Sequence, residues 1–172
     1  MKPWIFVIGL SLTLIGLISP QAGATPIDSV DLGDHRIELL SANVFDGEFY
    51  VWTYKVTSGT SPAISHWVLE ICQAIFDHAD GEVVTVLTNP DPTLGIIGVK
   101  FDDGFEDGEM RIVQIFLTAM AEVVEGDVGI KAGGDTYLGT ITAPGCEIPE
   151  PATVILIGAG ILGLATRRRT LF

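Results

Sequence analysis

Glu48-Phe-Tyr-Val-Trp-Thr-Tyr-Lys-Val-Thr57 alternates between two faces with a period of two residues. Successive side chains of a β-strand point to opposite sides of a sheet, so this period is typical of a strand with one buried face. The more apolar face should point to the core, and it carries Tyr50, Trp52, Tyr54 and Val56. The stretch therefore predicts a central strand of a β-sheet.

Further strands are expected on both sides of this one. They are short, and clusters of Gly, Pro, Asn, Asp and Ser separate them, as in turns. Residues 119–125 either extend the strand before them or form a short helix. The spacing predicts an all-β fold, an antiparallel β-sandwich of immunoglobulin-like type. The expected strands are 36–40, 64–72, 82–87, 95–101, 110–118, 128–132 and 137–142.

The first 24 residues have the composition of a secretory signal peptide. Lys2 supplies a positive charge, residues 4–18 are apolar, and Ala22-Gly23-Ala24 forms a small-residue cleavage site. This order is typical of a segment that is cut off after export, here after Ala24. A retained N-terminal anchor is the alternative. Residues 25–147 are then the secreted domain.

The C-terminal 25 residues combine three unlike elements in a fixed order. Pro149-Glu150-Pro151 is held extended by its prolines. The run that follows carries no charge, which predicts a transmembrane helix over about residues 152–166. Arg167, Arg168 and Arg169 follow directly and predict a cytoplasmic C-terminus. A plain single-pass anchor would need only the last two elements.

Residues 148–172 resemble the PEP-CTERM sorting domain of Gram-negative bacteria. The resemblance rests on Pro149-Glu150-Pro151, the short apolar run and the terminal arginines. It implies a substrate of exosortase, a membrane-embedded cysteine transpeptidase that removes the helix and releases or attaches the protein at the cell surface. It also implies a setting of exopolysaccharide and biofilm-matrix production.

The charge of the exported part excludes some partners. All 22 Asp and Glu lie between Asp28 and Glu150, against five Lys and Arg, which gives this part a net charge of −17. Nucleic acid and anionic lipid require cationic surfaces, so neither is expected as a partner. A solvated acidic surface is the simplest interpretation, and divalent cations are the alternative ligand.

Two cysteines remain after removal of the signal peptide, Cys72 and Cys146. The bacterial envelope is oxidising, so a disulfide between them is the default expectation. It would tie the end of the strand expected over residues 64–72 to the chain just before Pro149. Two free thiols, an intermolecular bond and a catalytic cysteine are the alternatives.

The other candidate sites have little support from their spacing. Asp102, Asp103, Glu106 and Asp107 form the densest acidic turn, and such oxygen-rich turns can bind calcium. The spacing departs from the EF-hand loop, so a solvated turn is the alternative. Ser65 and His66 adjoin on a predicted strand, where neighbours point to opposite faces and cannot act as nucleophile and base. No catalytic residue and no cofactor is expected.

Three classes of function follow. The first is a non-enzymatic surface or matrix protein with a structural or adhesive role, which signal peptidase and exosortase process. The second is a binding module for polysaccharide or calcium, which would expose an aromatic row near Phe49. The third is a secreted hydrolase, which would pair carboxylates in a concave site. The sequence favours the first.

Overall fold

A computed structural model describes residues 25–81 and 83–146. The predicted signal peptide and the whole C-terminal segment, including the predicted helix over residues 152–166, lie outside the described residues. Within the described ranges, the chain forms ten strands and every strand pair is antiparallel. None of the described residues belongs to a helix long and apolar enough to cross a membrane.

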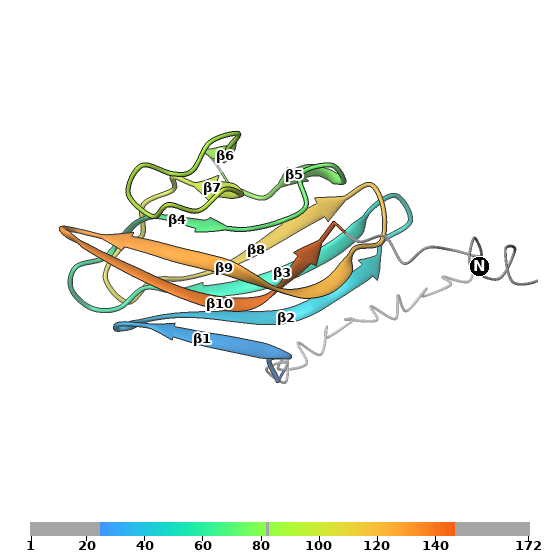
Figure 1. Ribbon diagram of the computed structural model, residues 1–172. Helices are drawn as coiled ribbons and strands as arrows, with labels where there is room; N and C mark the ends of the chain where they lie inside the picture. Colours follow the sequence, from blue (N-terminus) through green and yellow to red (C-terminus); the bar gives the residue numbers. More distant parts are fainter. Residues whose placement is uncertain (1–24, 82, 147–172) are drawn as a thin grey trace, which may run out of the picture.

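The strands form two five-stranded sheets (Figure 1). The order in the first sheet is β1-β2-β3-β8-β5, comprising β1 (Asp28–Leu32), β2 (His35–Phe45), β3 (Tyr50–Thr57), β8 (Met110–Leu117) and β5 (Phe76–Ala79). The order in the second is β10-β9-β4-β7-β6, comprising β10 (Asp135–Gly145), β9 (Glu122–Ala132), β4 (Ile64–Leu69), β7 (Val99–Phe101) and β6 (Val84–Val86). The predicted all-β, antiparallel class is confirmed.

One hydrophobic core draws side chains from both sheets. Trp52 and Tyr54 of β3 are fully buried, as the alternation of that strand predicts, and Trp67 and Ile130 face them from the second sheet. Trp67 stacks on Phe101 with ring centroids 4.2 Å apart. Large aromatic side chains bury the most apolar area per residue, so they contribute much of the stability of this core.

The edge strands β1 and β10 close one side between the two sheets. They contact each other, although they belong to different sheets. The carboxylate of Asp28 accepts hydrogen bonds from the backbone N–H and the hydroxyl of Thr142, both at 2.7 Å. The hydroxyl of Tyr54 donates to the Thr142 carbonyl oxygen at 2.9 Å. These polar contacts connect the sheets where the apolar core ends.

Several sequence-based boundaries were wrong. Residues 122–132 form one strand, whereas the sequence predicted a strand over 128–132 alone and left 119–125 as either an extension of the preceding strand or a short helix. β10 is almost twice as long as the expected 137–142. The two form a hairpin that turns at Gly133, whose φ of 55° suits glycine. β2 extends beyond the expected 36–40, and β1 and β5 were not predicted. The expected 64–72, 82–87 and 95–101 shorten to β4, β6 and β7.

Candidate functional site at the C-terminal end of the domain

The last strand ends at the point where the C-terminal segment begins. β10 is an edge strand, paired along its whole length with β9, from Asp135 opposite Ala132 to Gly145 opposite Glu122. Cys146 follows and is the last described residue. Anything attached to the C-terminal segment is therefore connected to the domain through an edge strand.

A disulfide joins Cys146 to Cys72, as the sequence predicts. The two Cα atoms lie 4.7 Å apart, although 74 positions separate the residues in sequence. Cys72 is buried beyond the end of β4, an interior strand of the same sheet, and its N–H donates to the carbonyl of Pro144 at 2.9 Å. The bond therefore anchors the end of the edge strand to the interior of its sheet.

An open groove of about 440 Å³ lies beside the disulfide. Its walls carry three carboxylates, from Glu70, Glu122 and Glu125. Glu70 accepts a hydrogen bond from the N–H of Asp127, and Glu125 accepts one from the hydroxyl of Thr140. Two of the three carboxylates thus have partners within the protein, and they support the β9–β10 hairpin.

The carboxylates of the acidic turn, which the sequence offered as a calcium candidate, contact different partners. Asp102 forms an ion pair with Lys100 at 2.8 Å, and Asp103 accepts the N–H of Val83 at 2.7 Å. Glu106 and Asp107 are exposed. Nowhere in the described ranges do three or more His, Cys, Asp or Glu side chains gather in a way that could hold a metal ion.

His66 belongs to a charged cluster that the sequence did not reveal. Its Nε2 lies 3.7 Å from Oδ1 of the buried Asp91, and Lys100 Nζ lies 3.4 Å from Oδ2 of the same carboxylate. Burial opposes ionisation of Asp91, yet the N–H groups of Thr93 and Leu94, with His66 and Lys100, hold its pKa below the usual value. Burial, together with Lys100, lowers the pKa of His66.

This cluster has a structural role. It holds the loop between β6 and β7 against β4, where Val68, Leu94 and Ile96 form a second small hydrophobic cluster. Ser65 contacts a different partner, because its hydroxyl donates to the carbonyl of Lys131 at 2.8 Å. Ser65 and His66 therefore contact different partners.

Aromatic side chains gather at the β3–β8–β5 side of the first sheet. The ring of His78 stacks on Phe116 with centroids 4.2 Å apart, and Phe49 meets both rings edge-on. His78 is exposed, and Phe49 and Phe116 are half-buried. The sequence singled out Phe49 for an aromatic row, and its two partners come from strands far along the chain.

The predicted sorting and processing residues all lie outside the described residues. These are Ala24, Pro149, Glu150, Pro151, Arg167, Arg168 and Arg169. What the structure does show is the position of the attachment point, at the exposed Cys146 and one residue before Glu147. Comparison with known families covers the segment that follows.

Residues 147–169 match the PEP-CTERM protein-sorting motif. The chain carries this sorting signal. The motif implies an exported protein that exosortase sorts, with a membrane-anchored precursor that later reaches the surface. No curated protein and no solved structure matches the chain. The sorting motif follows immediately after the disulfide-closed end of the domain.

Proposed function

We propose that this chain is a non-enzymatic surface or matrix protein whose β-domain exosortase delivers to the outside of the cell. The observation that carries the proposal is the adjacency of two features. The domain ends at a disulfide-linked Cys146, and the sorting motif begins at Glu147. Cleavage near Pro149-Glu150-Pro151 would leave the folded domain and its disulfide complete.

The order of events follows from the ends of the chain. The signal peptide starts export and is removed after Ala24. The apolar run then holds the precursor in the inner membrane with Arg167, Arg168 and Arg169 on the cytoplasmic side. Exosortase cuts at the Pro-Glu-Pro segment, and residues 25–147 take a structural or adhesive place at the surface, in an exopolysaccharide or biofilm setting.

Four carboxyl groups of the domain have a lowered pKa, which does not suit them to the general-acid role of the hydrolase alternative. A glycoside hydrolase needs one carboxylic acid whose pKa is raised, so that it stays protonated and can donate. In the described domain, the carboxyl groups with displaced pKa values are displaced downward by hydrogen-bond donors and cations. They are Asp28, Asp46, Asp91 and Glu109.

The strand order supports the immunoglobulin-like type within the sandwich class. The order β2-β3-β8-β5 corresponds to A-B-E-D of that fold, and β10-β9-β4 corresponds to G-F-C. The buried Trp67 lies on the strand equivalent to C, where such domains carry a tryptophan. The disulfide departs from the type, since it joins the ends of C and G rather than strands B and F. Domains of this type commonly serve as surface scaffolds.

A glutamate pair in the sorting segment provides the test. Glu150→Ala should stop processing and leave a precursor that retains the C-terminal arginines, while export continues. Glu147→Ala is the matched control, because it removes the same charge three residues earlier and outside the Pro-Glu-Pro core. Equal processing of both variants would contradict the proposal.

A polysaccharide-binding role is the second candidate, and the aromatic group at Phe49, His78 and Phe116 favours it. Sugar rings pack their apolar faces on aromatic side chains. Phe49→Ala with His78→Ala should then weaken retention on the host's exopolysaccharide at least several-fold. Met110→Ala, which truncates an exposed apolar residue at the other end of β8, is the control. Unchanged retention would remove this candidate.

A further inference from the structure

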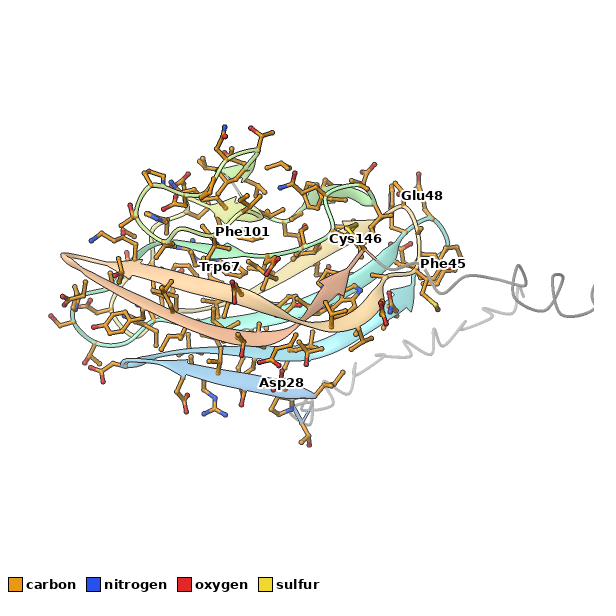
Figure 2. All side chains as sticks on the ribbon, in the orientation of Figure 1. Asp28, Phe45, Glu48, Trp67, Phe101 and Cys146 are labelled. Carbon is orange, nitrogen blue, oxygen red and sulfur yellow. A yellow bond between two sulfur atoms is a disulfide. The ribbon has the colours of Figure 1, made fainter. Side chains whose placement is uncertain are left out.

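The end of the domain that carries Cys146 also carries a group of exposed apolar side chains. We name this group the terminal face, and it consists of Val44, Phe45, Met120 and Val123, which are 52%, 57%, 49% and 58% exposed. Phe45, Glu48 and Cys146 lie at the same end of the molecule (Figure 2). Apolar side chains exposed at one end of a domain are candidates for a contact surface.

Hydrogen bonds and strand register place the four residues of the terminal face at the same end of the two sheets. Asn43 donates to the carbonyl of Ala121 at 2.8 Å and accepts its N–H at 3.0 Å, which joins the end of β2 to the β8–β9 loop. Val123 pairs with Pro144 on β10, two residues before Cys146. Val44 and Phe45 are therefore linked to Met120, and Val123 is linked to the chain end.

The length of chain beyond Cys146 limits how far this face can lie from the membrane. The apolar run predicted to enter the bilayer begins at Ala152, six residues further on. A chain of six residues spans at most about 20 Å when fully extended. The headgroup layer on each side of a bilayer is itself about 5–8 Å thick. In the anchored precursor, the terminal face therefore lies close to the lipid headgroups.

A short tether also makes weak contacts effective. It keeps the terminal face at a local concentration in the millimolar range or above next to the membrane. A few apolar side chains that would not bind a vesicle from solution can then insert among the headgroups, as apolar residues of membrane-surface segments do. Phe45 is the last residue of β2, where the β2–β3 turn begins, and Figure 2 places it at the same end of the molecule as Cys146.

The charge distribution restricts the kind of lipid. Asp46, Glu48 and Glu122 adjoin the terminal face in the sequence. The five cationic residues of the described ranges lie on strands at other positions of the sheets. Their register neighbours on the adjacent strands are Thr57 for Arg36, Glu38 for Lys55, Val56 for Arg111, Thr136 for Lys131 and Val68 for Lys100. An acidic rim without cations does not attract anionic headgroups, so the fitting surface is a zwitterionic bilayer.

We propose that the terminal face rests on the zwitterionic lipid–water interface while the precursor is anchored. The domain is then held against the membrane with its C-terminal end downward, which sets the height at which Pro149-Glu150-Pro151 meets the sorting enzyme. The inference rests on the sorting function proposed above, because it requires the anchored precursor.

Depth-dependent fluorescence quenching tests this proposal. The precursor that remains after removal of the signal peptide, residues 25–172, is reconstituted into phosphatidylcholine liposomes with and without brominated chains, as Phe45→Trp and as the control Thr136→Trp. Thr136 is exposed near the β9–β10 turn, nine residues and about 30 Å along β10 from Gly145. The wild-type signal from the native tryptophans is subtracted. Val123→Trp is a second probe of the face.

The expected result is that bromine quenches the added signal of Phe45→Trp and Val123→Trp at least twofold more than that of Thr136→Trp. Equal quenching of all three would overturn the proposal, as would quenching that grows in proportion to added phosphatidylglycerol. Quenching that needs reconstituted exosortase would assign the face to the enzyme instead and overturn the lipid contact. A precursor that does not float with the liposomes would overturn the anchored state itself, so the two failures are distinct.

Discussion

Cys72 and Cys146 connect the interior of the second sheet to the last residue before the sorting motif. β10 is an edge strand held along one side by β9, and a pull on its C-terminal end would otherwise separate this pair one hydrogen bond at a time. With the bond in place, a load on the C-terminal segment reaches the loop after β4 directly. The disulfide thus closes the domain at the point where the sorting motif begins.

Removing the disulfide should lower stability substantially. A closed loop of this size is worth about 4 kcal/mol in the chain-entropy model. The double variant Cys72→Ser with Cys146→Ser should therefore unfold on the order of 10 °C lower than wild type in a thermal melt. Reduced wild type should behave like the double variant. An unchanged melting temperature in both would contradict a stabilising role of the bond.

Asp28 should make stability depend on pH. Hydrogen bonds from the hydroxyl and the N–H of Thr142 hold the pKa of Asp28 below its usual value, against a smaller effect of burial. Its contribution is therefore complete above the unfolded pKa near 3.9 and is lost as pH falls through the lower folded pKa. Asp28→Ala should cost about 1–2 kcal/mol at pH 7 and less as pH falls below about 4.

The control for this prediction is Asp31→Ala, because Asp31 also lies on β1 but forms an exposed ion pair with Arg36. Such a pair is worth at most about 1 kcal/mol. Urea denaturation at several pH values measures both variants. A loss for Asp28→Ala that stays constant down to pH 2 would show that the carboxylate does not carry the effect.

Asn43 should be hard to replace. It has a φ of 51°, exchanges two hydrogen bonds with Ala121 and accepts a third from Trp52 Nε1 at 3.1 Å. Asn43→Ala loses all three bonds and also places alanine in the left-handed region, so about 2–4 kcal/mol of stability should disappear. Asn43→Gly loses the bonds alone and should be about 1 kcal/mol less harmful. Denaturant melts of the two variants separate the bonds from the backbone, and equal losses would mean that the backbone carries none of the cost.

The sequence predicted what local pattern can encode. The alternation of residues 48–57 identified the buried face of β3, and the oxidising compartment predicted the pairing of Cys72 with Cys146. β9 was missed in part because its exposed face carries Glu125 and Asp127, which have low strand propensity. Pairing with both β4 and β10 outweighs that preference, and such pairing is a tertiary effect.

The clusters at His66 and at His78 could not be read from the sequence for a related reason. His66, Asp91 and Lys100 come from β4, a loop and β7, and only the fold brings them together. His78 meets Phe116 because β5 pairs with β8 across a bulge. The sorting motif is the opposite case, since it consists of consecutive residues and was found from the sequence alone.

Intact mass spectrometry of the protein from its native host tests the central claim most directly. The membrane, surface and medium fractions are measured separately under non-reducing conditions. We expect a surface or medium form that begins at Thr25, ends near Pro149 to Pro151 and is two mass units lighter than its reduced form because of the disulfide. A form found only in the membrane fraction, with Arg167, Arg168 and Arg169 still present, would contradict it.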